Sequence, residues 1–377
     1  LGRDFNGFTA VDNVSLAVRK GDIHAIIGPH SAGGIALSGH VDTVPVEGQA
    51  WSADPFALHG GSDLYLLPTQ TLVGVTAARQ LGISGPEDMW GGYVDHEFIC
   101  TKAITHGLLN RAAVAPQGWA PLFAERVRKV VLDGVSVFSL GDAQPAAEQL
   151  LQRGPIRLKP IHACAGRGQE VIHDIDAFRQ LLKRPEIAEQ FASGVVLEQD
   201  LKEVITHSVG QSFFGDTVLS YCGQQYLTED GQGEQVYGGS DLLVVRGYYD
   251  DLLGLDLPVD VRLAIEQAQV FDAAADEAYP GFYASRRNYD IAQGLDAQGQ
   301  RCSGVLEQSW RMGGASSAEV AALQSFVNDP RLKAIRASSV ETYLDSPLPA
   351  GAIEVYRGPA ENSEFLLKYV TVNSYDG

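Results

Sequence analysis

The chain has 377 residues, 45% of them hydrophobic, which is enough apolar material for a substantial core divided over two or three subdomains. Its formal net charge of −19 argues against nucleic acid and anionic membranes as partners, because both would repel it at long range. No apolar run approaches the ~20 residues that span a bilayer, and no signal-peptide pattern opens the chain. The four cysteines form no zinc-spaced cluster, which suits a reducing compartment, so we expect a cytoplasmic protein.

Residues 1–33 predict two short strands, at 15–18 and 23–27, that run into a glycine turn. This segment resembles the start of the ATP-binding subunit of an ABC transporter. That family continues with Gly-Lys-Ser/Thr in a phosphate-binding loop, whereas this chain has GPHSAGGIAL. We therefore do not expect the segment to bind nucleotide on its own.

Residues 33–58 contain GHVDTVP and resemble the first metal-binding segment of the acetylornithine deacetylase group of zinc-dependent amidohydrolases. The resemblance implies that His40 binds a metal and that Asp42 orients it. A working site also needs a bridging carboxylate, an adjacent Glu pair and a further His, and none follows at a recognisable spacing. The alternative, which we favour, places His40 and Asp42 on a surface turn without metal.

Residues 101–119 predict a short helix at 103–109, with Thr101 as its cap and Lys102 at its start. Taken alone, Lys102 is compatible with an ordinary solvated lysine near a helix start. Residues 155–160, PIRLKP, alternate like a buried strand that ends near Lys159.

The loop CAGRGQ follows this strand, and Gly166 and Gly168 in it would let backbone amides approach an anion, with positive charge from Arg167. A glycine-bearing hairpin turn with incidental cations is the alternative. Residues 194–201 predict an apolar strand that carries Glu198 near its end, where the carboxylate either lies beside a ligand or caps the following turn.

Two alternating segments, 282–294 and 302–311, predict a hairpin whose turn places Gly299 at a positive φ. Such a hairpin brings Asp290 and Glu307 close together on neighbouring strands. Side chains at steps of two share one face of a strand, so we expect Glu307, Ser309 and Arg311 to point the same way. A salt bridge between Arg311 and a carboxylate is the structural alternative.

The remaining segments predict scaffold. Helices are expected at 142–153 and 258–279, and a long hairpin at 206–228. Four charged residues further along the chain are candidates for an acidic substrate group, although paired surface charges are the expected alternative; they are Asp241, Arg246, Arg286 and Arg287.

From about residue 63 to the C-terminus, the runs TKAITH, RLKPIHACAGRGQ, YGGSDLLVVRG, FYASRRNYDIAQG and GVLEQSWRMGGAS resemble a family of bacterial proteins related to ATP-grasp enzymes. The resemblance implies an α+β, ATP-grasp-like fold, in which two subdomains enclose a nucleotide site behind an N-terminal α/β region. The implied limits are a composite segment at 1–62, the α/β region at 63–133, subdomain 1 at 134–200 and subdomain 2 at 201–377.

The same resemblance implies ATP and Mg²⁺ as cofactors and a role for each motif residue. The implied ATP-binding residues are Lys102, Lys159, Gly166, Arg167, Gly168, Gln169 and Glu198. The implied Mg²⁺ ligands are Asp290, Glu307 and Ser309, where Ser309 replaces the family's Asn, and Arg311 is the catalytic cation that faces the transferred phosphoryl group.

The implied reaction is ATP-dependent ligation of a small-molecule carboxylate to an amine or thiol through an acyl phosphate, and a homodimer is compatible with it. The amidohydrolase based on His40 and Asp42 remains an alternative function. A non-catalytic ATP-binding module is another, and Ser309 in place of Asn favours it.

Overall fold

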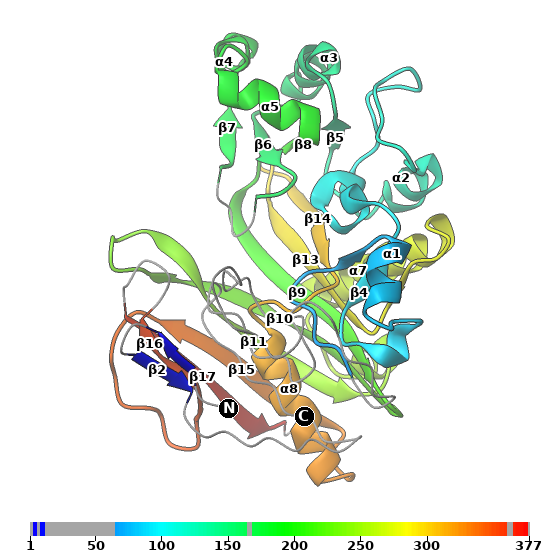
Figure 1. Cartoon of the computed structure of the whole chain (residues 1–377). Coiled ribbons are helices and arrows are strands. Elements are labelled where there is room, and N and C mark those ends of the chain that lie inside the picture. The colour runs from blue at the N-terminus through cyan, green and yellow to red at the C-terminus, as the bar shows by residue number, and fades with distance from the viewer. Residues whose placement is uncertain (1–2, 6–7, 12–64, 164–167, 360–364, 376–377) are drawn as a thin grey trace.

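An antiparallel sheet of eight strands is the largest element in the part of the chain that the structure describes (Figure 1). The structure is a computed structural model, and it describes residues 3–5, 8–11, 65–163, 168–359 and 365–375. The eight strands, in spatial order, are β14 (Arg301–Ser309), β13 (Arg286–Leu295), β9 (Lys202–Phe214), β10 (Thr217–Glu229), β11 (Gln235–Arg246), β15 (Ala334–Thr342), β17 (Phe365–Ser374) and β16 (Ile353–Pro359).

Helices cover both faces of this sheet. The alternation along β11 shows the division: Leu242 and Val244 pack with α8 (Ser316–Asn328), whereas Leu243 and Val245 belong to the cluster that contains α6 (Tyr249–Leu253) and α7 (Val259–Ala278). Successive side chains of a strand point to opposite faces, so one apolar run supplies two cores. The result is a sheet between two helical layers.

A second, four-stranded antiparallel sheet forms a smaller body at the top of Figure 1. Its strands, in spatial order, are β5 (Gly134–Val137), β8 (Val195–Gln199), β6 (Ile156–Pro160) and β7 (Glu170–Ile172). The helices α3 (Leu140–Leu151), α4 (Ile175–Leu181) and α5 (Pro185–Ser193) pack against it around a core of its own. The chain passes from this sheet to the larger one between Gln199 and Lys202.

The N-terminal part of the described chain is built from short elements. A three-stranded sheet contains β3 (Leu72–Val73), β4 (Gly92–Val94) and β12 (Tyr283–Ala284), beside α1 (Val75–Gln80), whereas α2 (Pro121–Val127) packs against α7. Three 3₁₀-helices are η1 (Pro86–Asp88), η2 (Glu97–Cys100) and η3 (Lys102–Thr105). A separate pair of strands consists of β1 (Arg3–Phe5) and β2 (Phe8–Val11).

The predicted α+β class is confirmed, and so are several elements. The strand predicted at 155–160 is β6, the hairpin predicted at 206–228 is β9 and β10, and the predicted helices at 142–153 and 258–279 are α3 and α7 with ends shifted by one or two residues. The strands predicted at 15–18 and 23–27 lie outside the described residues. Among the described residues, no helix is both long enough and apolar enough to cross a membrane.

The helix predicted at 103–109 is wrong. The chain forms only the 3₁₀-helix η3, because His106 adopts an extended backbone with φ −121° and ψ 158°. Thr101 does cap this helix, since its Oγ1 accepts a hydrogen bond from the amide of Ala103 at 3.2 Å. The early end of η3 allows the His106 side chain to enter the core instead of continuing a helical surface.

Candidate functional site

The segment from Lys102 to His106 lies where the two sheets meet. Lys102 is only 6% exposed; its Nζ lies 2.8 Å from Oε2 of Glu307 and donates to the carbonyl of Ala163 at 2.6 Å. Thr105 Oγ1 donates to the carbonyl of Leu306 on β14 at 3.0 Å. Lys102 is therefore an internal cation between β14 and the end of β6, and the solvated surface lysine considered from the sequence is wrong.

Glu198 on β8 is bound by a lysine and a histidine inside the same junction. Its carboxylate forms an ion pair with Lys159 Nζ through Oε1 and a hydrogen bond with His106 Nε2 through Oε2 at 2.8 Å. All three side chains are buried. Burial alone would raise the pKa of Glu198, but Lys159 and His106 together lower it to about 2. Glu198 is thus an anion at neutral pH that orients Lys159, and it does not serve as the turn cap considered from the sequence.

His106 is a residue of this junction that the sequence pattern did not reveal. Its position is supported by Gly134 on β5, because a Cβ atom there would lie 2.6 Å from the imidazole ring. The available signal was the run TKAITH, which places a histidine four residues after Lys102. One short segment therefore supplies both a site cation and the second partner of Glu198.

The His106 hydrogen bond gives a first prediction. His106→Ala is expected to lower the free energy of unfolding by about 2 kcal/mol, because a buried carboxylate loses a charge-assisted hydrogen bond. Urea denaturation at pH 7 measures the change, and His106→Gln, which keeps an N–H donor, should recover much of the loss. Equal losses in both variants would show that ring packing, rather than the hydrogen bond, stabilises the junction.

Two carboxylates face each other on the neighbouring strands β13 and β14. The predicted hairpin is confirmed: Asp290 is the cross-strand partner of Glu307, and Gly299 in the connecting turn has φ 76°. Asp290 Oδ1 accepts hydrogen bonds from Gln225 Nε2 at 2.8 Å and from Asn288 Nδ2 at 3.1 Å. Burial, reinforced by the charge of Glu307, raises the pKa of Asp290 to about 7.

The other two residues predicted on this hairpin, Ser309 and Arg311, lie at the end of β14 and just beyond it. Glu307 and Ser309 both belong to β14 and share a face, while Gln308 between them points the other way and donates to the carbonyls of Ile99 and Thr101 at 2.7 and 2.8 Å. Arg311 lies beyond the last residue of the strand, so strand alternation does not extend to it. Its Nη1 donates to the carbonyl of Met312 at 2.7 Å.

The glycine-bearing loop is described only at its end. Gly166 and Arg167 lie outside the described residues, and Gly168 follows with φ 66°. Gln169 Oε1 accepts a hydrogen bond from Arg157 Nη1 at 3.5 Å, and Arg157 also pairs with Asp200. Gln169 therefore points along the sheet toward Arg157.

The arginines considered as ligands for an acidic substrate group are paired within the protein. Arg286 pairs with Glu319, and Arg287 pairs with Asp272 and Asp276. Arg246 donates to the carbonyls of Phe326 and Leu332 and lies over the Phe326 ring. The alternative of paired charges is confirmed for Arg286 and Arg287, although Arg286 lies in the core and not on the surface. Asp241 is exposed on β11.

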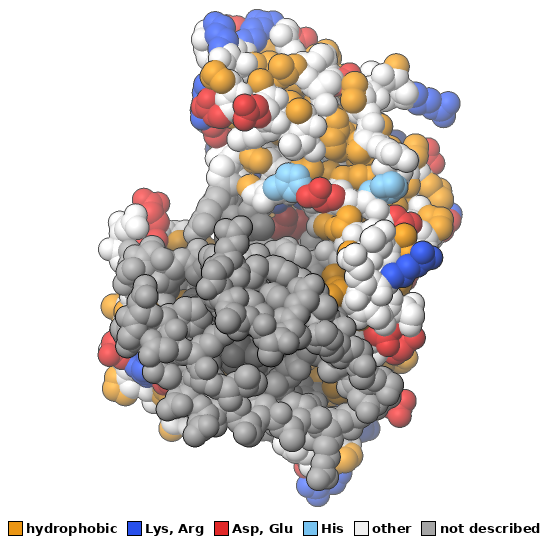
Figure 2. All heavy atoms as spheres, viewed as in Figure 1, with side chains coloured by type: hydrophobic (Ala, Val, Ile, Leu, Met, Phe, Trp, Pro, Cys, Tyr) orange, Lys and Arg blue, Asp and Glu red, His pale blue; other side chains and the backbone are white. Residues whose placement is uncertain are grey.

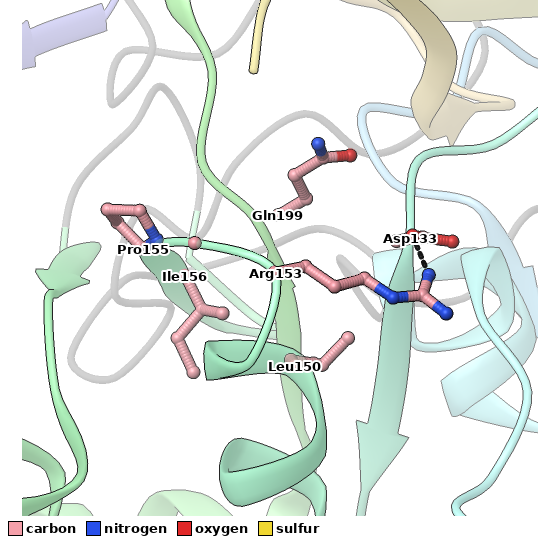
Figure 3. Close-up of a pocket in the computed structure, with 7 residues that line it drawn as sticks. Asp133, Leu150, Arg153, Pro155, Ile156 and Gln199 are labelled. Carbon is pink, nitrogen blue, oxygen red and sulfur yellow. Dashed lines mark hydrogen bonds and ion pairs between the residues drawn. The ribbon is translucent and has the colours of Figure 1, made fainter. Parts of the chain in front are cut away.

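Cavities of two sizes lie in the described part of the chain, and only the smaller one is close to the junction. The one in Figure 3 lies where α3 ends and β8 leaves the small sheet, beside the pair between Arg153 and Asp133. Its volume of about 10 Å³ has room for roughly one water molecule, so it cannot hold a nucleotide. A larger cavity of about 230 Å³ lies between η2 and the turn after α7.

The described residues contain no group of three or more His, Cys, Asp or Glu side chains placed to hold a metal. His40 and Asp42 lie outside the described residues. Figure 2 shows histidine and acidic side chains together on the surface just above the region drawn in grey. The exposed pair of His162 and Glu97, 4.0 Å apart, joins the end of β6 to η2.

Comparison with known proteins places the chain in a family. The family described as "Protein of unknown function (DUF3182)" matches residues 49–370, so the chain belongs to this family. The match begins after the segments that resemble an ABC transporter subunit and after His40 and Asp42, and it supports neither of those two resemblances. No curated protein matches the sequence.

Two solved structures are similar to the chain. One is phosphoribosylamine–glycine ligase from Thermotoga maritima, with 14% identity, coverage of 82% of this chain and 80% of that one, and a TM-score of 0.44. The other is D-alanyl-alanine synthetase A from Vibrio cholerae, with 11% identity, coverage of 64% and 67%, and a TM-score of 0.32. At these scores neither likeness assigns an activity to the chain, so the assignment of a function rests on the geometry of the chain's own residues.

Proposed function

We propose that this member of the DUF3182 family binds ATP with Mg²⁺ at the junction of its two sheets and joins a small-molecule carboxylate to an amine or thiol. The observation that carries the proposal is the convergence there of two buried lysines and a pair of facing carboxylates from separate parts of the chain. Lys102 and Lys159 are 6% and 5% exposed, and Asp290 and Glu307 are cross-strand partners.

The side chains at the junction are of the types that bind Mg²⁺ and the phosphates of ATP. Mg²⁺ beside a triphosphate takes one or two carboxylates, phosphate oxygens and water, so Asp290 and Glu307 suffice and a third acidic ligand is not required. Ser309, on the same face as Glu307, offers a hydroxyl oxygen. Lys102 is within 2.8 Å of Glu307, so a phosphate bound beside the ion would also lie near an ammonium group.

Bound ATP would supply its γ-phosphoryl group to the carboxylate and be left as ADP, Mg²⁺ would offset the phosphate charge, and the amine or thiol would then displace inorganic phosphate from the acyl phosphate. The protein's own contribution is electrostatic: Lys102, Lys159 and Arg311 offset negative charge as that group moves. Glu198 keeps Lys159 oriented by an ion pair, and His106 keeps Glu198 in place. A site arranged before the reaction does not have to reorganise during it.

Calorimetry with the non-hydrolysable analogue AMP-PNP and Mg²⁺ tests the proposal. Wild type is expected to bind it with micromolar affinity, and Lys159→Met is expected to bind about 100-fold more weakly, because the buried ammonium that faces the phosphates is lost. Lys183→Met, which removes an exposed lysine from the same small body, is the matched control.

Because Lys159→Met leaves Glu198 without its cation, thermal melting must accompany the titration. The double variant Lys159→Met, Glu198→Gln keeps the pair neutral and tests binding in a folded protein. Absence of binding to folded wild type, or equal binding by the Lys159 variants, would overturn the proposed site.

A second candidate function is nucleotide binding without turnover. Ser309 favours it, since related enzymes have an Asn there and an amide oxygen is the stronger metal ligand. Wild type would then bind AMP-PNP but release no phosphate from ATP with any carboxylate offered, and Ser309→Asn would be the variant in which turnover appears.

A further inference from the structure

The cavity of about 230 Å³ lies away from the candidate nucleotide site. Its walls come from residues 94–99, from Gly118 and from residues 278–282. Ile99 in one wall is held through its carbonyl by Gln308, whose side chain points to the opposite face of β14 from that of Glu307. The cavity therefore lies behind the sheet that carries the carboxylate pair.

The floor of the cavity is apolar and its size is that of a small ligand. Val94 and Ile99 are 0% and 3% exposed, and Pro280 and Phe282 line the opposite side. Dry cavities of about 150 Å³ already accept a benzene ring. A single ring or a branched aliphatic body therefore fits here, whereas a nucleotide does not.

Three side chains with polar atoms line this otherwise apolar cavity: Asp95, His96 and Tyr279. Asp95 is exposed, so its carboxylate lies at the open side of the cavity; it accepts a hydrogen bond from Tyr93 at 2.6 Å, and no Lys or Arg of the described residues pairs with it. Tyr279 is 6% exposed, and within the described part of the chain no hydrogen bond to its hydroxyl is found. Burial raises the pKa of Tyr279, so the hydroxyl stays neutral.

We propose that this cavity binds a compact organic cation, a primary ammonium group carried on a single-ring or branched apolar body. An ammonium group has three donors, which suit the Asp95 carboxylate and the Tyr279 hydroxyl, and its charge offsets that of Asp95. No Lys or Arg lines the cavity in the described residues, and the net charge of −19 attracts cations and repels anions. The site does not depend on the proposed ATP reaction.

Benzylammonium is the probe, titrated by calorimetry at pH 7 into the full chain. We expect millimolar or tighter binding, and about tenfold weaker binding of the neutral benzyl alcohol, because one charge-assisted contact is worth about that factor. Asp95→Asn should reduce benzylammonium affinity to a similar degree and leave benzyl alcohol unaffected.

Two alanines of α7 give a matched pair of variants. Ala278→Leu adds a side chain to the cavity wall and is expected to abolish binding, whereas Ala273→Leu changes an exposed position on the same helix and should bind like wild type. The proposal is overturned if folded wild type does not bind benzylammonium, if benzyl alcohol binds equally well, or if Ala278→Leu leaves binding unchanged. Loss of AMP-PNP binding would not affect it, so the two sites are tested separately.

Discussion

The Arg286→Leu variant is expected to lose about 3 to 5 kcal/mol of the free energy of unfolding, the largest effect of any substitution considered. Arg286 and Glu319 are 1% and 0% exposed, and their side chains meet in two contacts, at 2.6 and 3.1 Å. Removing the guanidinium leaves Glu319 as a buried charge without its cation. Equilibrium denaturation in urea at pH 7 measures the loss.

Controls for this prediction separate the burial of charge from the loss of packing. Arg331→Leu removes an arginine that is 90% exposed, and it should change the free energy of unfolding far less than Arg286→Leu does, because solvent screens an exposed ion pair. The double variant Arg286→Leu, Glu319→Leu should be more stable than Arg286→Leu alone, because no unpaired charge remains. If the single and double variants are equally unstable, packing of the guanidinium, not the ion pair, supports this part of the core.

The Arg286 pair also bears on the candidate site. Arg286 donates to the backbone carbonyls of Ser309 and Arg311, and Glu319 accepts a hydrogen bond from Tyr221 at 3.0 Å. The Tyr221 hydroxyl also lies 2.8 Å from Oδ1 of Asn288, whose Nδ2 donates to Asp290. The pair thus joins α8 to both strands that carry the carboxylates, so a folded variant is expected to bind AMP-PNP more weakly.

Alternation and turn chemistry were sufficient to predict the elements that carry most of the candidate site. The segments around Asp290 and Glu307 alternate in hydrophobicity and are joined by a glycine turn, and these local features predict the hairpin; they do not reveal the register shift between Asp290 and Ile291 that sets Glu307, rather than Leu306, opposite Asp290. The position of Lys159 near the end of a strand could be predicted in the same way, because the sequence of β6 alternates between apolar and polar residues. Each of these features depends on neighbouring residues only.

Long-range contacts explain what the sequence could not show. His106 lies 92 positions before Glu198, and nothing local indicates that its ring enters the core or that Gly134 leaves space for it. The burial of Lys102 and the pairing of Arg286 with Glu319 depend on contacts between distant elements in the same way. The residue types alone indicated which of these side chains are charged or form hydrogen bonds. Their burial and their partners could be known only from the folded structure.

The second large effect is a dependence of stability on pH that arises from Asp290. Its pKa in the folded protein is raised to about 7 from an ordinary value of 3.8, chiefly by burial and then by Glu307. Between these two pH values the folded state binds more protons than the unfolded state, so the free energy of unfolding falls as pH rises. Allowing for its partial exposure, we expect wild type to lose about 3 kcal/mol between pH 4.5 and pH 8.5 through this group.

Asp290→Asn isolates that contribution, because the amide keeps hydrogen-bonding atoms and does not titrate. In buffer with a chelator, the variant should lack the loss attributed to Asp290, so the difference in unfolding free energy between variant and wild type should grow as pH rises from 4.5 to 8.5. Asp272, whose pKa burial also raises, is present in both proteins and cancels in that difference. A difference that is constant over this range would mean that Asp290 is already ionised at pH 4.5, and the carboxylate pair would then be better solvated than its position between β13 and β14 implies.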